Sequence, residues 1–584
     1  MNRVEKLREQ ILSQGPTDEQ RKAIFAEERE FLLRASPGSG KTWTSCRRFI
    51  WRGASWDYKV GGLALLSFTN AAIREFHAAT NKVGYPELLS DPNYVGTFDS
   101  FVERFILTPF GHLVTGLQKR PHLHISPRPT DWINRKLSVW VQLSGGRKCR
   151  IHAWDIIPFP NNGEVGFKTF LGNTLLFTEY NPVEELFKLG RYTHAQRVYL
   201  AWRILSTHPS ITRCLARRFP EIIVDEAQDT NIWLLILLAL LRKNGAKITL
   251  IGDPDQCIYE FSMADATSLT TLKTKWAISE KPLTKSFRCN TLIAEAVRNI
   301  SGNNSFTGCG PGANEYHKPF IVREPSNKGF GYSISAFNRL LECSRIQLAD
   351  SAIICRGNAQ LESIRGEVNY GKLTGLTKKL AEASFYRDVR KDYGKAFQIV
   401  EGVAREIVDA PGVWEEIDEH PESNKSYSVR LSLWKFVRSP LGLPAVSENG
   451  DNWIIKLRES IANLLKEIGI SAQVRIGQKI RRNGLTKNQL LLPLFKEQEL
   501  FPAIRQETVH AVKGESISSV MLLGTANFFN SIVADIAAGR NTENRRLAYV
   551  GMTRARHALL VGLPASHFDK HLMVWKRWGF VVLS

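Results

Sequence analysis

Short apolar runs that end at glycine or acidic residues recur in the first half of the chain. Phe31–Ala35 leads into a glycine-rich turn, Glu221–Val224 leads into two carboxylates, and Ile248–Ile251 leads into a Gly-Asp-Pro turn. Apolar runs this short, bounded by turn residues, are typical of strands that are buried on both faces of a parallel sheet. The pattern therefore predicts an α/β fold with parallel sheets.

Other apolar patterns add elements to this picture. The periodicity of Trp453–Ile468 predicts an amphipathic helix, and Asp350–Ala359 has the pattern of a strand and a turn. The longest apolar run, Trp233–Leu241, is too short to span a bilayer, and the charged N-terminus lacks the apolar core of a signal peptide. We therefore expect a protein without a membrane partner.

Composition narrows the class of partner. The chain has 584 residues, which is long enough for several compact domains. Its 78 Lys and Arg residues exceed its 57 Asp and Glu residues, giving a formal net charge of +21. This excess favours a polyanionic partner, because each cation near a phosphate releases counterions; a basic protein with no such partner is the alternative. The 8 cysteines form no Cys-x-x-Cys pair, which argues against zinc sites and favours the reducing cytoplasm.

The segment that follows the first apolar run has the pattern of a phosphate-binding loop. Its glycines let backbone N–H groups close on phosphate oxygens, and the following helix adds a partial positive charge. Lys41 would reach the β- and γ-phosphates of ATP, and the Thr42 hydroxyl would bind Mg²⁺. Ala35 replaces the first glycine of the general pattern, so a chance match is the alternative, but the order of strand, loop and helix favours an ATP site. The loop residues are Ser36, Pro37, Gly38, Ser39 and Gly40.

Carboxylates at the end of a second strand supply what such a site needs next. Asp225 and Glu226 follow Glu221–Val224, at the strand end where open α/β sheets bind ligands. Asp225 would hold Mg²⁺ through its water shell, and Glu226 would orient or deprotonate the attacking water. Alone, an apolar strand followed by Asp-Glu is usually structural, but beside a phosphate loop it indicates catalysis. Gln256, after the third strand, is a candidate γ-phosphate sensor, although its surroundings alone indicate only a tight turn.

Taken together, the ordered motifs resemble the UvrD/Rep/PcrA family of superfamily 1 helicases. Pro16–Gln20 looks like its Q motif, which implies that Gln20 reads the adenine edge; a helix-capping box at Thr17 is the alternative, and both can hold. Leu283–Cys289 looks like the NYRS segment, in which Phe287 would stack on adenine and Arg288 would be one arginine finger.

Two segments near the C-terminus extend the resemblance. Thr508–Glu515 is similar to the THSAKGxE segment, which links ATP to DNA. It implies a DNA contact for His510 and a ribose contact for Glu515, although the family's acid stands one position later. Arg545–Ala555 is close to RRLxYVxxTRA and implies that Arg554 is the second arginine finger.

The same resemblance implies a path for single-stranded DNA. Leu66–Ala72 is similar to TFTNKAA, Val95–Phe101 resembles GTFHS, and Gly252–Phe261 matches GDxxQSIYxW/F. Asp99 replaces the usual His and Glu260 replaces the usual Arg, and a carboxylate near DNA phosphates is unfavourable. The DNA-contacting residues that the resemblance implies are Phe68, Thr69, Asn70, Thr97, Phe98, Tyr259 and Phe261.

The resemblance implies two RecA-like P-loop domains, each carrying a mainly helical insertion, with ATP between them. The first domain would take residues 1–108 and 206–278, with an insertion at 109–205; the second would take 279–366 and 500–584, with an insertion at 367–499. Basic and aromatic residues interleave in the first insertion, as a nucleic-acid surface or a solvated face with core tryptophans would require.

The implied function is an ATP-dependent 3′–5′ DNA helicase or translocase that uses ATP and Mg²⁺ on single-stranded or tailed DNA, in DNA repair or in anti-phage defence. Phe98–Glu103, Thr108–Phe110 and the compact second insertion look like the helicase-like B subunit of Gabija anti-phage systems, which works with an OLD-family nuclease. The alternative is an ATP-gated DNA-end sensor that recruits or regulates a partner nuclease with little unwinding. The replacements at Asp99 and Glu260 favour this alternative.

Overall fold

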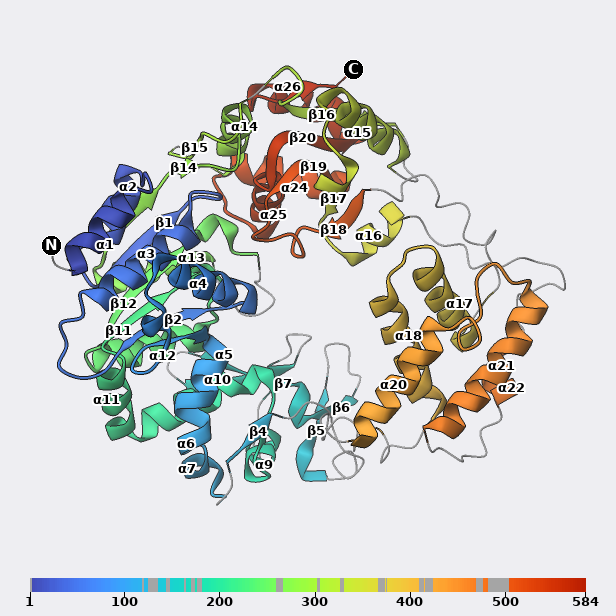
Figure 1. Cartoon of the computed structure of the whole chain (residues 1–584), viewed down its shortest axis with the longest axis horizontal. Helices are drawn as coiled ribbons and strands as arrows, with labels where there is room; N and C mark the ends of the chain where they lie inside the picture. The colour runs from blue at the N-terminus through green and yellow to red at the C-terminus, as the bar shows by residue number, and fades with distance from the viewer. Residues whose placement is uncertain are drawn as a thin grey trace. The chain divides into compact units, whose positions relative to one another are not determined.

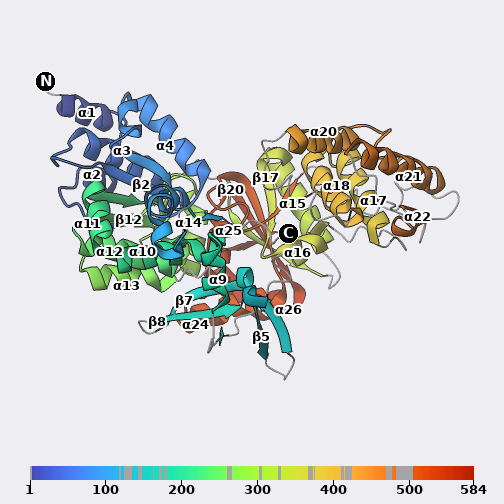
Figure 2. The same cartoon turned by 90° about the horizontal axis from the view of Figure 1, so that it is seen from below.

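A computed structural model of the chain contains two compact units. One consists of residues 1–357 and 507–584, and the other of residues 358–506 (Figures 1 and 2). The structure describes residues 3–583 except for 118–119, 124–134, 143–147, 162–163, 170–173, 176–180, 259–265, 302–304, 313, 326–329, 366–372, 374, 409–413, 415–423, 469–475 and 482–503.

The first sheet confirms the strands that the apolar runs predict. Its order is β13-β1-β12-β11-β2-β3, and neighbouring strands pair in parallel. Leu32 packs into one core with helices α10 and α12, whereas its neighbour Leu33 packs into another with α3 and α4. Because both faces are covered, the strands read as continuous apolar runs. The elements are β1 (Phe31–Ala35), β2 (Leu63–Ser67), β3 (Tyr94–Thr97), β11 (Glu221–Val224), β12 (Lys247–Gly252), β13 (Ser279–Leu283), α3 (Lys41–Ala54), α4 (Asn70–Val83), α10 (His194–Thr207) and α12 (Ile232–Lys243).

The edge strand β13 corrects one predicted boundary. The predicted second domain begins at residue 279, but Ser279–Leu283 pairs with β1 along its whole length. The first sheet therefore continues to Leu283. The strand is an edge strand with exposed polar residues, so its sequence, Ser-Glu-Lys-Pro-Leu, lacks the apolar run that marks the buried strands.

The first insertion is not mainly helical, which corrects a second prediction. Its described residues include two antiparallel groups of strands and a short parallel pair, β4 (His122–Leu123) with β10 (Arg191–Tyr192), together with helix α9 and most of α10. Along β7, buried and half-buried residues alternate, a period of two that belongs to a strand. The indole N–H of Trp233 on α12 donates to the Pro158 carbonyl at 2.8 Å and fixes β7 on the first domain. The elements are β5 (Ser138–Gln142), β6 (Lys148–His152), β7 (Ile156–Asn161), β8 (Glu164–Thr169), β9 (Thr174–Leu175) and α9 (Pro182–Lys188).

The second sheet has the order β18-β17-β19-β20-β16-β21. The predicted strand in Asp350–Ala359 is confirmed as β17, and β19 pairs in parallel with both β17 and β20. A core cluster joins the sheet to helices α14, α24, α25 and α26. The elements are β16 (Pro319–Glu324), β17 (Ser351–Cys355), β18 (Arg505–Thr508), β19 (Ile517–Leu523), β20 (Ala555–Pro564), β21 (Val581–Val582), α14 (Thr291–Ser301), α15 (Gly331–Ser344), α24 (Ala526–Ala537), α25 (Glu543–Met552) and α26 (Ala565–Arg577).

The unit formed by residues 358–506 encloses the predicted second insertion, and the elements described in residues 358–504 are helical. The predicted helix at Trp453–Ile468 is confirmed as α21, on which Trp453, Leu457 and Ile461 are buried one turn apart. None of the helices in the described part of the chain is long and apolar enough to cross a membrane. The unit's helices are α16 (Asn358–Arg365), α17 (Gly375–Asp388), α18 (Tyr393–Ile407), α20 (Asn424–Arg438), α21 (Gly450–Glu467) and α22 (Ile476–Lys479).

Candidate functional site

The predicted phosphate loop lies between β1 and α3 and forms one wall of a cavity of about 1080 Å³. Gly38 and Gly40 have φ angles of 71° and 76°, in the left-handed region that glycine adopts without strain. A Cβ atom at Gly38 would lie 2.5 Å from the Cβ of Arg288, so the loop and the Arg288 segment approach each other as closely as their backbones allow. Among the described side chains, none caps the start of α3, as an anion-binding helix terminus requires.

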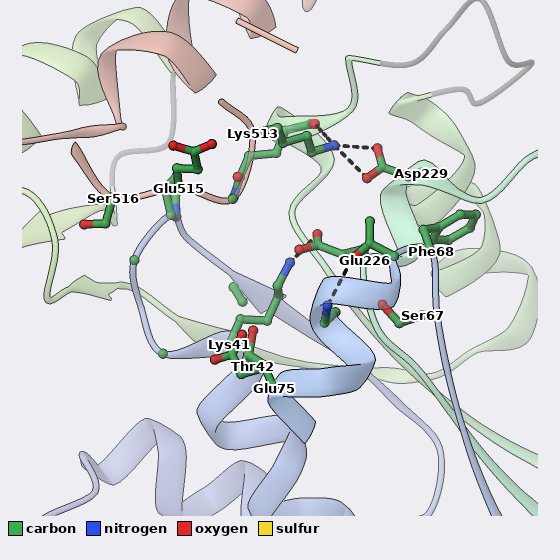
Figure 3. Close-up of a pocket in the computed structure, with 18 of the residues that line it drawn as sticks. Lys41, Thr42, Ser67, Phe68, Glu75, Glu226, Asp229, Lys513, Glu515 and Ser516 are labelled. Atoms are coloured by element: carbon green, nitrogen blue, oxygen red, sulfur yellow. Dashed lines mark hydrogen bonds and ion pairs between the residues drawn. The ribbon is translucent and has the colours of Figure 1, made fainter. Parts of the chain in front are cut away.

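Lys41 and Glu226 form an ion pair at the centre of this cavity (Figure 3). Glu226 has a left-handed backbone with φ of 53°, and it also accepts a hydrogen bond from the Gln228 side chain at 2.5 Å. Burial alone would raise the pKa of Glu226, but Lys41 and then Lys513 lower it to about 2. The carboxylate is therefore ionised at neutral pH, as a group that orients or deprotonates water must be.

Asp225 is buried, and neither of its carboxylate oxygens has a hydrogen-bond partner among the described groups. Burial raises the pKa of this carboxyl to about 7, and Lys41 opposes the rise. An unpartnered buried carboxylate is costly unless a cation neutralises it. Together with the Thr42 hydroxyl, which lines the cavity, Asp225 fits the oxygen ligands that Mg²⁺ prefers.

Two arginines of the second domain reach the same cavity. Arg554 is buried; its Nε donates to the Val550 carbonyl at 2.9 Å and its Nη2 donates to Gln256 Oε1 at 3.2 Å. Arg288 donates to the carbonyls of Thr553 and Gly514 at 3.3 and 3.2 Å. Burial lowers the pKa of both guanidinium groups. The structure thus brings both predicted arginine fingers to the cavity that Lys41 and Glu226 line.

Gln256 links the end of β12 to helix α25. Its Nε2 donates to Asp253 Oδ2 at 2.9 Å, while the Tyr549 hydroxyl donates to the same oxygen at 3.4 Å. Burial, and then the neighbouring Asp255, raise the pKa of Asp253 to about 7. Gln256 is a candidate from the sequence and Asp253 is not, because a buried carboxylate in a turn motif gives no separate signal.

Lys513, which the sequence alone did not single out, joins the two domains. Its ammonium donates to Asp229 Oδ1 and Oδ2 at 2.7 and 2.6 Å and to the Gln256 carbonyl at 3.0 Å (Figure 3). Asp229 lies three residues after Glu226, in the turn that follows the strand Glu221–Val224, and Lys513 lies inside the motif of Thr508–Glu515. A lysine and an aspartate in two motifs expected to share one site were the available signal.

The nucleotide-base candidates lie in different surroundings. Phe287 is 46% exposed, lines the cavity, and donates its backbone N–H to the Gly38 carbonyl at 2.8 Å. Gln20 is buried; its Nε2 donates to the Ser39 carbonyl at 3.1 Å, and its Oε1 accepts from Thr17 N–H at 2.9 Å. The capping box at Thr17 is thus present, and Gln20 braces the phosphate loop. Glu515 lines the cavity, as does its neighbour Ser516.

The DNA candidates of the first domain continue the wall of the cavity. Phe68, Thr69, Thr97 and Phe98 all line it, and the rings of Phe68 and Phe98 are 5.1 Å apart. Phe98 is only 2% exposed, so its ring belongs to the core. Thr69 and Thr97 cap helices α4 and α5 (Phe98–Val102), and Asn70 is the first residue of α4.

The remaining DNA candidates are His510, Tyr259 and Phe261, and the replaced position Asp99 belongs to the same motifs. Asp99, the replacement noted above, pairs with Arg197 at 2.7 Å, so its charge is already balanced. A ring nitrogen of His510 lies 3.0 Å from the Ile258 carbonyl, next to the segment that should carry the base contacts. Tyr259 and Phe261 themselves, with Glu260, lie outside the described residues.

Comparisons with known proteins agree with this arrangement. The family model of the UvrD/REP helicase N-terminal domain matches residues 16–140 and 177–277, and that of the UvrD-like helicase C-terminal domain matches residues 443–565. The DNA helicase II of Haemophilus influenzae is 22% identical over 95% of this chain and 85% of its own length. Escherichia coli DNA helicase II is 23% identical over 93% and 83%, and the ATP-dependent DNA helicase PcrA of Bacillus subtilis is 22% identical over 94% and 82%.

Proposed function

The chain belongs to the UvrD-like helicases and is an ATP-dependent DNA helicase, and we propose that it moves 3′ to 5′ along single-stranded DNA by closing its two domains on ATP. One observation carries this proposal. The phosphate loop and Glu226 of the first domain and Arg288 and Arg554 of the second line a single cavity. A nucleotide bound there would touch both domains, so its hydrolysis would change the contact between them.

The hydrolytic step follows from the contacts in the cavity. Lys41 would exchange Glu226 for phosphate oxygens, which frees the Glu226 carboxylate to orient the attacking water. Arg288 and Arg554 would neutralise the charge that develops on the transferring phosphoryl group. Thr42 and Asp225 would hold Mg²⁺, which supplies further charge neutralisation at the phosphates.

The path from ATP to DNA would run through the segment Thr508–Glu515. Lys513 and Glu515 line the cavity, and His510 meets the Ile258 carbonyl just before the residues expected to contact bases. A change in this segment on hydrolysis would therefore reach the strand. Phe68, Thr69 and Thr97 on the same cavity wall support a strand path beside the nucleotide.

The biological role is a cytoplasmic motor in DNA repair or in anti-phage defence. The +21 charge supports DNA as the substrate. The short segments that resemble the Gabija B subunit support the defence version, with an OLD-family nuclease as partner.

A second candidate function is an ATP-gated DNA-end sensor that recruits or regulates a nuclease and unwinds little. The Asp99–Arg197 pair favours it, because Asp99 replaces a group that could donate to a DNA phosphate. A sensor needs the ATPase and DNA binding but not processive movement.

The test compares ATP hydrolysis with and without single-stranded DNA in the wild type, Lys41→Ala and Arg554→Ala. Strand displacement on 3′-tailed and 5′-tailed duplexes is measured in parallel. DNA-stimulated hydrolysis that both variants lose, with displacement only from the 3′ tail, supports the motor. Stimulated hydrolysis without displacement supports the sensor, and hydrolysis that DNA does not stimulate contradicts both.

A further inference from the structure

The contact between Lys513 and Asp229 joins parts of the chain that lie 284 residues apart. Lys513 lies in the turn between β18 and β19 of the second domain, and Asp229 ends the turn that follows β11 of the first. Both side chains are nearly buried, with 10% and 7% of their surface exposed. The ammonium has three N–H groups, and the two Asp229 oxygens and the Gln256 carbonyl provide three acceptors. The pair is therefore satisfied without any phosphate.

Lys513 and Asp229 are close neighbours of the groups that face the γ-phosphate in the proposed reaction. Gln228 donates to Glu226 Oε2 at 2.5 Å, and its own Oε1 accepts from Asp253 N–H at 3.1 Å. Lys513 donates to Asp229, the residue that follows Gln228, and to the backbone carbonyl of Gln256. The side chain of Gln256 in turn accepts a hydrogen bond from Arg554. One ammonium from the second domain thus fixes the two turns of the first domain that carry Glu226 and Gln256.

Stability alone does not account for such a pair. Removing two charges from water is costly, and an apolar pair of similar volume often stabilises a fold as well or better. Burial raises the pKa of Asp229 to about 6 while Lys513 opposes the rise, so the carboxylate depends on Lys513 for its charge. What the pair does provide is a fixed position of the Thr508–Glu515 segment against the turns that carry Glu226 and Gln256.

We propose that Lys513 and Asp229 form a positioning pair that sets Glu226 and Gln256 for hydrolysis when the second domain closes on ATP. The proposal rests on the proposed function, because it requires that the cavity hold ATP. Both residues line the cavity, but the Lys513 ammonium is already paired with Asp229 and Gln256, so both would act through their neighbours. Loss of the pair should therefore slow the chemical step and leave ATP binding unchanged.

The experiment uses the full chain with Lys513→Gln, Asp229→Asn and the double variant Lys513→Met with Asp229→Asn, which leaves no buried charge unpaired. Asp569→Asn is the matched control, since it removes the exposed carboxylate that pairs with Arg323 in the second domain. Circular dichroism and melting temperature report the fold, binding of the fluorescent analogue mant-ATP with Mg²⁺ reports affinity, and steady-state hydrolysis on single-stranded DNA reports kcat and KM.

We expect kcat to fall on the order of 100-fold, as misplacement of a catalytic group by about 1 Å does, with KM and mant-ATP affinity within about threefold. The double variant should lose no more than either single variant, because the residues act as a unit. Wild-type kcat in the folded double variant would overturn the proposal, and so would a parallel loss of kcat and mant-ATP affinity, which marks a direct phosphate ligand. A wild type without DNA-stimulated hydrolysis contradicts the proposed function instead.

Discussion

Replacement of Arg554 by lysine tests the proposed hydrolytic step at a residue whose contacts the structure defines in detail. The side chain is 1% exposed and makes separate contacts through Nε, Nη1 and Nη2, to Val550, Glu515 and Gln256. A lysine keeps the charge but has one nitrogen, so it cannot keep all three contacts and still point at the cavity. The variant therefore separates the geometry of the finger from its charge.

The magnitude follows from the role of the group. An arginine finger contributes about 10³–10⁵ in kcat, which is roughly 4–7 kcal/mol of transition-state stabilisation. We expect Arg554→Lys to lose at least about 10³ of kcat, because the planar fork is what matches a phosphoryl group. Buried carbonyls that the guanidinium no longer satisfies cost about 1–3 kcal/mol each, so the melting temperature should also fall.

The assay is single-turnover hydrolysis at a temperature well below the melting transition of the variant, with mant-ATP affinity measured on the same sample. Arg323→Lys, which changes an exposed arginine of the same domain, is the control. A kcat within about tenfold of the wild type in a folded variant would refute the reasoning. So would a loss confined to ATP affinity, because the side chain would then bind the ground state and the transition state equally.

Three further predictions test other parts of the site. Gly40→Ala should weaken ATP binding by about 1–2 kcal/mol, because its φ of 76° is strained for alanine and the new methyl would lie 2.8 Å from Gln20 Nε2; Gly402→Ala, where nothing lies within 4 Å, should not alter mant-ATP titrations. Glu226→Gln should lower kcat by roughly 10²–10⁴ and retain ATP, since Lys41 loses its carboxylate partner; equal losses of kcat and affinity would contradict the assigned role. For Asp253, burial raises the folded pKa from 3.8 to about 7, so the folded state binds the proton more tightly and the free energy of unfolding falls as pH rises from about 4 to 7. Asp253→Asn should remove that part of the pH dependence in denaturant titrations, and an unchanged slope would show that Asp253 does not titrate in this range.

The sequence predicted those parts of the fold that burial dictates. Phe31–Ala35 and Glu221–Val224 are covered on both faces, so their apolar runs were sufficient to identify them. Ser279–Leu283 is an edge strand, and its polar residues do not form the apolar run that identifies a buried strand. The strands of the first insertion were overlooked because their alternation is short and interrupted.

The site residues also divide into those that the sequence could identify and those that it could not. Lys41, Glu226, Arg288 and Arg554 could be named from motifs, and the structure brings them to one cavity. The motif context placed Lys513 and Asp229 near one site, but their contact itself could not be derived, since it depends on how two sheets separated by long insertions face each other. Gln20 shows the limit of motif assignment, because its amide is already engaged by the loop that it braces.

The insertion of residues 358–504 between β17 and β18 bears on how the second sheet folds. These strands are neighbours in the sheet, and Val509 N–H donates to the Cys355 carbonyl at 2.9 Å, although about 150 residues separate them. Closing a flexible loop of that length has a large entropic cost and slows folding. If the inserted unit folds first around Trp453, it removes most of the entropic cost of closing the long loop. The pairing of β17 with β18 then costs little more than pairing two strands that are close in sequence. The order in which the units fold would then decide how fast the second half of the ATP site is assembled.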